Sequence, residues 1–272
     1  MNYQQLWRLL AKEYGEGEAK AMARMVYEVG YGLTMADVLA GRDAGVADVE
    51  RVARRLMAHE PVQYVLGCAD FCGRQFKVDA SVLIPRPETE ELCRWIVAEW
   101  GGASCRVLDV GTGSGCIAVT LAKEMTGARV EAWDISEKAL AVARQNARLL
   151  KADVTFRQQD ALRLADEATA VYDVIVSNPP YICRKERASM EANVLEYEPE
   201  SALFVPDDDP LLFYRAIARY GLSALRSGGC LYFELNPLYA EALGQMLRSM
   251  AWSDVELRTD EYGKQRMIRA RR

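Results

Sequence analysis

The sequence predicts an α/β protein with a doubly wound, mainly parallel sheet of seven strands, preceded by a small helical domain. Three observations predict it: strand-like and helix-like segments alternate beyond residue 104, a glycine-rich turn follows the first of these strands, and the first sixty or so residues show only helical periodicity. We expect a helical bundle over residues 1–62, a β-hairpin linker over 63–85 and the sheet domain over 86–272.

Bulk composition narrows the class of protein. The 272 residues contain no apolar run near the roughly 20 residues that a membrane span requires, and the N-terminus lacks the basic and apolar regions of a secretory signal. We therefore expect a soluble, cytoplasmic protein with no membrane contact. A net charge of −5 argues against direct nucleic-acid binding, which usually needs a basic face. The seven cysteines and one histidine are scattered, so we expect no metal site and reduced, packed thiols.

The expected bundle contains four helices. Apolar stripes run through residues 6–10 and 21–26, and glycines end the second of these helices. A capping box opens a short third helix at residues 34–41, and Pro61 stops a fourth that contains the apolar stripe of 49–57. No catalytic grouping occurs here, so the role we expect is contact rather than chemistry.

In the expected linker the spacing of apolar residues changes from helix-like to strand-like. Apolar residues from Tyr64 to Val78, interrupted by Gly67 and Gly73, predict a β-hairpin that begins with residues 64–66. A stiff segment, Ile84-Pro85-Arg86-Pro87-Glu88-Thr89-Glu90, then leads into a helix that ends near Trp100.

The sheet domain follows as alternating elements. Its expected strands lie near residues 106–110, 128–133, 153–158, 171–177, 230–235, 254–259 and 265–270. Its expected helices lie near residues 116–125, 137–150, 210–226 and 238–250. No helical pattern separates the last two strands, so we expect them to pair antiparallel.

The turn after the first strand is the first candidate binding element. Asp109 precedes alternating glycines at Gly111, Gly113 and Gly115, with Thr112 and Ser114 between them. Glycines there let the backbone turn tightly and approach a ligand beneath a helix N-terminus. A dinucleotide fingerprint would need glycine at position 116, which is Cys116, so the turn suits a ligand without a pyrophosphate. Asp109 would attract a cation, such as the ammonium of an amino acid.

Two further acids follow the next two strands. Asp134 stands where ribose hydroxyls are bound in open α/β sheets, although it could instead cap the next helix, a role for which Ser136 is also available. Asp160, followed by Ala161, ends the third strand at the same edge and could accept from an adenine amino group. Together with the turn, these acids predict an adenosine-plus-amino-acid ligand.

The fourth strand ends abruptly at Ser177-Asn178-Pro179-Pro180-Tyr181. Asn-Pro is a common turn, and two prolines cannot continue a central strand. Because each proline keeps the residue before it extended, the Asn178 side-chain oxygen and the Pro179 carbonyl could face the same way. They would form two fixed acceptors for a planar NH₂ group, with Tyr181 stacked on its plane.

These motifs carry a resemblance. Asp-x-Gly-x-Gly-x-Gly followed by Asn-Pro-Pro-Tyr resembles the class I S-adenosylmethionine-dependent methyltransferases that modify planar nitrogens. Residues 60–67, Glu-Pro-Val-Gln-Tyr-Val-Leu-Gly, and the segment 84–90 are similar to those of the HemK/PrmC family, the peptide chain release factor glutamine N5-methyltransferases.

The resemblance implies S-adenosyl-L-methionine as cofactor, S-adenosyl-L-homocysteine as product, and the glutamine of the Gly-Gly-Gln motif of class I release factors as substrate. It implies a substrate-binding role for residues 1–62 and a methyltransferase catalytic domain over 86–272. The catalytic residues it implies are Asn178, Pro179, Pro180 and Tyr181. The cofactor-binding residues it implies are Asp109, Gly111, Thr112, Gly113, Ser114, Gly115, Asp134, Asp160, Ala161 and Asn178.

Three alternatives stay open: a glutamine methyltransferase of a ribosomal protein, an adenine-amino DNA methyltransferase, and a non-catalytic scaffold that binds a translation factor. Two stretches depart from the family pattern. Glycines usual around Val205–Asp209 are replaced by Val-Pro-Asp-Asp-Asp, and the glycine usual after Phe233-Glu234 is replaced by Leu235-Asn236. Neither stretch belongs to the glycine turn or to Asn-Pro-Pro-Tyr.

Overall fold

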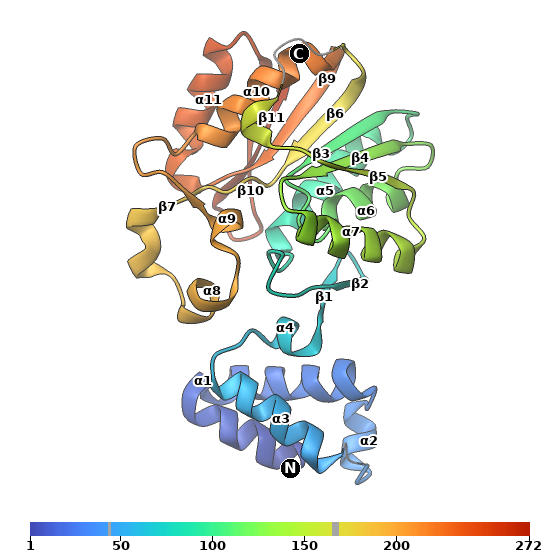
Figure 1. Ribbon diagram of the computed structural model, residues 1–272, viewed down its shortest axis with the longest axis vertical. Coiled ribbons are helices and arrows are strands. Elements are labelled where there is room, and N and C mark those ends of the chain that lie inside the picture. The colour runs from blue at the N-terminus through green and yellow to red at the C-terminus, as the bar shows by residue number, and fades with distance from the viewer. Residues whose placement is uncertain (43–44, 165–168) are drawn as a thin grey trace. The chain divides into compact units, whose positions relative to one another are not determined.

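The computed structural model describes residues 1–42, 45–164 and 169–272 and divides into two compact units (Figure 1). The first, here called the helical unit, comprises Met1–Cys68 with Glu191–Tyr197. The second, the sheet unit, comprises Ala69–Met190 with Glu198–Arg272. The division at Cys68 lies inside the stretch 63–85 that we expected to be a linker.

The helical unit forms because apolar residues recur on one side of each helix. Helix α1, Tyr3–Met25, carries both predicted stripes, on either side of a break at Gly15, where φ is 75° and ψ is 165°. A π-helical turn, Val26–Gly30, follows. The predicted capping box at Thr34 and Asp37 opens α2, Met35–Leu39, and α3 spans Val46–Met57. Their buried core contains Leu6, Leu10, Met22, Ala23, Val26, Tyr27, Val49, Val52, Ala53 and Leu56.

The strand expected at residues 64–66 is wrong. These residues belong to helix α4, Val62–Leu66, which begins after Pro61 and ends at Gly67 with φ 70°. The Arg55 guanidinium donates to the carbonyl oxygens of Val65 (3.1 Å) and Tyr64 (3.3 Å), so it caps the end of this short helix. A contact from ten residues upstream therefore decides the local structure.

The hairpin itself is shorter than predicted. Strands β1, Cys68–Phe71, and β2, Arg74–Lys77, are joined by Cys72 and Gly73, both with positive φ (48° and 70°). Two such residues give a two-residue turn that suits the natural twist of a hairpin.

The sheet has seven strands in the order β10-β11-β9-β6-β3-β4-β5. Their bounds are β3 Arg106–Val110, β4 Arg129–Asp134, β5 Val154–Gln158, β6 Tyr172–Ser177, β9 Leu225–Glu234, β10 Ser253–Thr259 and β11 Gln265–Arg271. Strand β11 pairs antiparallel with both β9 and β10, and the other pairs are parallel. The predicted mainly parallel sheet and its antiparallel last pair are confirmed.

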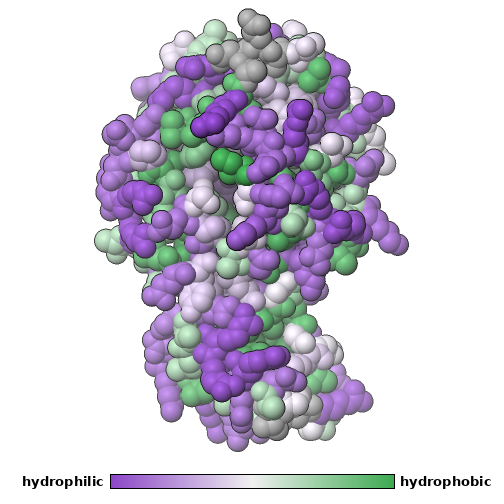
Figure 2. Space-filling view, in the orientation of Figure 1, coloured by the Kyte–Doolittle hydropathy of each residue, from purple (hydrophilic) through white to green (hydrophobic). Residues whose placement is uncertain are grey.

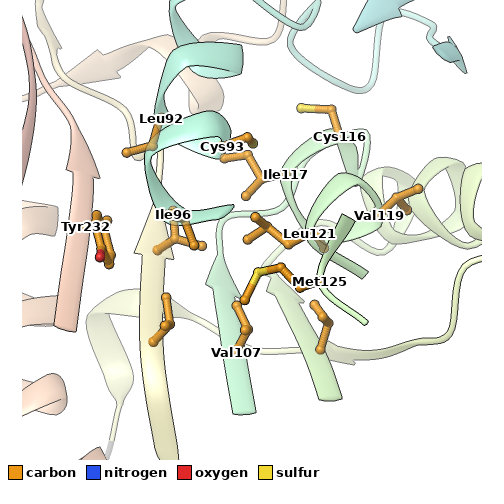
Figure 3. Close-up of a cluster of buried hydrophobic side chains, with 14 of the residues drawn as sticks. Leu92, Cys93, Ile96, Val107, Cys116, Ile117, Val119, Leu121, Met125 and Tyr232 are labelled. Carbon is orange, nitrogen blue, oxygen red and sulfur yellow. The ribbon is translucent and has the colours of Figure 1, made fainter. Parts of the chain in front are cut away.

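Helices cover both faces of this sheet (Figure 1). One face carries α5 Pro87–Trp100, α6 Cys116–Glu124 and α7 Glu137–Leu150, and the other carries α10 Leu212–Ala224 and α11 Ala240–Ser249. Neighbouring strand residues point to opposite faces, so Val107 joins the first core and Leu108 the second. Figure 3 shows the first core, in which side chains of α5 and α6 converge on the strands: Leu92, Ile96, Ile117, Leu121, Val107 and Tyr232.

Several elements between residues 182 and 205 were not predicted. They are β7 Ile182–Cys183, a 3₁₀ turn Arg184–Ser189, α8 Ala192–Tyr197, α9 Glu200–Leu203 and β8 Phe204–Val205. Each is six residues or shorter, so none displays a readable period.

Polar and charged side chains dominate the face drawn in Figure 2, with apolar residues in small patches between them. In the described part of the chain, no helix combines the length and apolar character needed to cross a membrane.

Candidate functional site

A cavity of about 350 Å³ lies in the sheet unit at the carboxyl ends of β3, β4, β5 and β6. Open α/β sheets bind ligands at this edge, and the volume falls within the range of small-molecule sites. Three of its walls are elements that the sequence singled out: the glycine turn, the two acids after β4 and β5, and residues 177–180. The remaining walls come from residues 81–86 with Thr89, and from 199–204 with Phe213 and Ile217.

The glycine turn is fastened to the neighbouring strand. The amides of Gly111 and Thr112 both donate to the carbonyl oxygen of Trp133, at 2.8 and 2.9 Å. All three glycines have positive φ: 76° at Gly111, 55° at Gly113 and 82° at Gly115. Only Gly115 is also crowded, because a Cβ there would lie 3.0 Å from the Cβ of Ala143 on α7. The glycines thus serve the turn, and the last of them also lets α6 and α7 approach.

Asp109 lies beneath this turn and is not among the residues that line the cavity. Its Oδ2 accepts a hydrogen bond of 2.6 Å from the Thr112 hydroxyl. Burial raises the pKa of Asp109 to about 7, although the Thr112 hydrogen bond opposes the shift. The backbone amide of Ala118 on α6 also lowers the pKa of Asp109, so the carboxylate interacts with the start of this helix as well as with the turn.

The two other acids do line the cavity. Asp134 accepts from the amides of Gly113 (2.9 Å) and Ser136 (2.8 Å), and burial raises its pKa. The helix-capping alternative for Asp134 is wrong, because the Ser136 hydroxyl caps α7 by accepting from the Ala139 amide at 3.2 Å. Asp160 caps the 3₁₀ turn Ala161–Arg163 by accepting from the Leu162 amide at 2.8 Å.

Strand β6 ends where the sequence predicts, at Ser177, whose hydroxyl donates to the carbonyl oxygen of Val110 at 2.6 Å. This bond ties the end of β6 to the end of β3. Asn178, Pro179 and Pro180 then line the cavity next to the glycine turn. The structure therefore brings the predicted acceptors and the predicted binding turn into one site.

Tyr181 stands differently from the prediction. It is not among the cavity-lining residues, and its hydroxyl donates to Oε1 of the buried Glu234 at 3.1 Å. Burial, reinforced by the neighbouring Glu234, raises the pKa of Tyr181, so its hydroxyl stays protonated. Its ring packs against the α10–α11 core. Tyr181 therefore supports the Asn-Pro-Pro turn through its contacts with the protein and does not present its ring to the cavity for stacking.

Sequence reasoning missed two polar contacts of the site. Thr89, only 3% exposed, accepts from Nδ2 of Asn178 at 3.3 Å and donates to Glu234 at 2.6 Å. Glu198, also buried, accepts from Arg86 (2.5 Å) and from the Ile84 amide (3.2 Å), so it joins two cavity-lining segments. Thr89 and Arg86 lie in the segment 84–90, whose resemblance to the family was the only feature of the sequence that pointed to a role for them.

The two departures from the family pattern make ordered contacts. Asp207 accepts from the Lys185 amide at 2.9 Å, and Asp209 accepts two hydrogen bonds from Arg215 at 2.8 and 2.9 Å. Asn236 donates to the carbonyl oxygen of Tyr181 at 3.2 Å, so it holds the backbone directly after the two prolines. Here asparagine supplies a side-chain contact that a glycine lacks.

Among the residues that the structure describes, no group of three His, Cys, Asp or Glu side chains is arranged to hold a metal ion. Five of the seven cysteines are buried as thiols: Cys93, Cys105, Cys116, Cys183 and Cys230.

Comparison with known proteins decides the family. Residues 89–197 match the model of the methyltransferase small domain. A release factor glutamine methyltransferase of Bacteroides thetaiotaomicron is 47% identical over 264 residues, which cover 95% of each chain. The chain belongs to the release factor glutamine methyltransferase family. A second member of this family, from Flavobacterium psychrophilum, is 40% identical and covers 98% of this chain and 97% of its own.

The fold agrees with the family. A methyltransferase of Pyrococcus furiosus superposes with a TM-score of 0.56 over 82% of this chain and 98% of its own, at 15% identity. The predicted class I methyltransferase fold and the predicted family are both confirmed.

Proposed function

We propose that this protein transfers a methyl group from S-adenosyl-L-methionine to the side-chain amide nitrogen of the glutamine in the Gly-Gly-Gln motif of class I release factors. The observation that carries the proposal is the position of Asn178 and Pro179 in the same cavity as the glycine turn. Membership of the release factor glutamine methyltransferase family supports the choice of substrate. The five cysteines that are buried as thiols agree with a cytoplasmic site of action.

The residues present fit the cofactor. Asp134 would hold the ribose hydroxyls, Asp160 and Ala161 would hold the adenine, and residues 111–115 would face the amino-acid part. Asp109, which lies beneath the turn, would attract the ammonium group of this part by its charge. When bound, S-adenosyl-L-methionine supplies an activated methyl group on a positively charged sulfur.

The chain's own task is to hold the substrate nitrogen. An amide nitrogen is a poor nucleophile because its lone pair is delocalised into the carbonyl. Oδ1 of Asn178 and the carbonyl oxygen of Pro179 would each accept a hydrogen bond from one N–H of the glutamine amide and thereby fix its nitrogen in position. Orientation of this kind contributes roughly 7–11 kcal/mol to lowering a barrier. The same acceptors stabilise positive charge that develops on the nitrogen, so no strong base is needed before attack.

The raised pKa of Asp109 predicts a pH-dependent affinity for the cofactor. Below its pKa of about 7 the carboxyl is mostly neutral and attracts an ammonium weakly, so the affinity is expected to increase as the pH rises from about 5.5 to about 7. Asp109→Asn should flatten this dependence and weaken binding, measured by calorimetric titration of S-adenosyl-L-methionine. An equal slope in the wild type and the variant would contradict the role of Asp109.

We also propose that the helical unit binds the release factor away from its glutamine. Its described residues contain a core of their own, and none of them lines the cavity. A chain lacking residues 1–60 should show a raised KM for the whole release factor and a nearly unchanged KM for a short Gly-Gly-Gln peptide. Cofactor affinity serves as the folding control, and equal changes in both KM values would refute this role.

The test of the proposed reaction is methylation of purified release factor by the purified protein. Titration with labelled S-adenosyl-L-methionine separates an enzyme from a scaffold, because a scaffold need not bind the cofactor. Methylation of a ribosomal protein or of DNA in place of the release factor would favour the corresponding alternative.

A further inference from the structure

We propose that Thr89 and Glu234 are positioning residues that orient the side-chain amide of Asn178, so that its nitrogen is held by the protein and its oxygen is free for the substrate. The inference rests on the proposed function and adds to it two residues that act through Asn178.

The side chain of Glu234 is a buried carboxylate. Glu234 ends β9, is 1% exposed, and accepts hydrogen bonds through both oxygens. Oε2 accepts from the Thr89 hydroxyl at 2.6 Å, and Oε1 accepts from the Tyr181 hydroxyl at 3.1 Å. Burial raises the pKa of Glu234, whereas the hydrogen bonds from Thr89 and Tyr181 and the guanidinium of Arg266 on β11 favour its charged form. A carboxylate that receives two hydroxyl donors acts only as an acceptor here.

The Thr89 hydroxyl has a single proton to donate. Because Glu234 takes that proton, the Thr89 oxygen has only lone pairs to offer to a further partner. Nδ2 of Asn178 lies 3.3 Å from this oxygen and donates to it. A reversed amide would bring Oδ1 of Asn178 against the Thr89 oxygen with no hydrogen between the two acceptors, which is repulsive.

The orientation of the Asn178 amide determines which of its atoms faces the substrate. Asn178 and Thr89 both line the cavity, so the amide oxygen that Thr89 does not contact is the one left for an incoming NH₂ group. A reversed amide would present its own NH₂ to that substrate group and would repel it. The chain Glu234–Thr89–Asn178 therefore selects the productive orientation of the acceptor.

The test compares two substitutions at one position. Thr89→Val keeps the shape and removes the hydroxyl, so the single-turnover rate should fall about 10- to 100-fold, as expected for a misplaced reacting group, with the KM for the release factor and the affinity for the cofactor nearly unchanged. Thr89→Ser keeps the hydroxyl and should restore most of the rate. Thr120→Val is the matched control, because the Thr120 hydroxyl is buried without a partner on α6 and its loss should leave the rate unchanged.

A second readout needs no substrate. In protein labelled with ¹⁵N at asparagine, the side-chain NH₂ signal of Asn178 is assigned as the one absent from Asn178→Ala. Its exchange with solvent should be slow in the wild type and in Thr89→Ser, and faster in Thr89→Val. Since this signal reports the Thr89 contact directly, it tests the inference even if the wild type fails to methylate a release factor, a result that would count against the proposed function alone.

Three results would overturn the inference. One is a wild-type single-turnover rate in Thr89→Val, and another is a rate in Thr89→Ser as low as that in Thr89→Val. The third is an Asn178 NH₂ exchange rate that is the same in the wild type and in Thr89→Val.

Discussion

Replacing Asn178 with alanine is expected to lower the single-turnover rate of methyl transfer by about 10²- to 10³-fold or more, the range found when one preorganised hydrogen-bonding group of a catalytic site is removed. The variant loses the oxygen that would hold one amide hydrogen of the glutamine. Most expected cofactor contacts lie on residues 111–115, Asp134 and Asp160, so the affinity for S-adenosyl-L-methionine should stay largely intact. Rapid-quench methylation of a release factor and calorimetric titration of the cofactor measure the two quantities.

Gln245→Ala is a control for this experiment. Gln245 lies on α11 of the sheet unit, and its exposed side-chain amide donates to Glu241 at 3.1 Å. The control should methylate at the wild-type rate. An Asn178→Ala protein that does the same would remove Asn178 from the reaction.

Replacing Gly115 with alanine is expected to reduce the free energy of unfolding by about 2–5 kcal/mol. Its φ of 82° costs an alanine about 1–2 kcal/mol. The added Cβ would also lie 3.0 Å from the Cβ and 3.2 Å from the Cα of Ala143, and overpacking of this kind costs about 1–3 kcal/mol. Urea unfolding measures the change, and the cofactor affinity should fall as well because α6 carries the end of the glycine turn.

Gly127→Ala separates strain from crowding. Gly127 has a similar φ of 92°, but a Cβ there meets nothing within 4 Å. This control should lose only about 1–2 kcal/mol, the cost of the backbone conformation. Equal losses at Gly115 and Gly127 would show that the contact between α6 and α7 does not depend on glycine.

The sheet could be predicted from the sequence because its central strands, β3 and β6, are buried on both faces and its helices have long amphipathic patterns. Strand β9 begins at Leu225, five residues before its predicted start, because polar and glycine residues at 226–229 interrupt the apolar run. Gly229 allows the backbone to pass close to the carbonyl oxygen of Asp173, which would lie 3.0 Å from a Cβ. Such an approach between distant segments has no local signature.

Some residues of the candidate site could likewise be predicted from the sequence, and others could not. Asp134 and Asp160 could be placed at the cavity because parallel strands bring their carboxyl ends to one edge. The contact of Thr89 with Glu234 joins residues 145 positions apart, and that of Asn178 with Thr89 joins residues 89 apart. Packing of α5 against the sheet creates both contacts, so motif spacing did not reveal them. The contacts of Tyr181 with Glu234, 53 residues away, and with the α10–α11 core also join distant segments, so its position outside the cavity lining was missed too.

The most direct test of the central claim is to incubate the purified protein with S-adenosyl-L-methionine and a purified class I release factor, and to map the modified residue by peptide mass spectrometry. We expect one added methyl group, located on the side-chain nitrogen of the glutamine in Gly-Gly-Gln. A methyl group on any other residue, or a release factor left unmodified by a protein that binds the cofactor, would contradict this expectation.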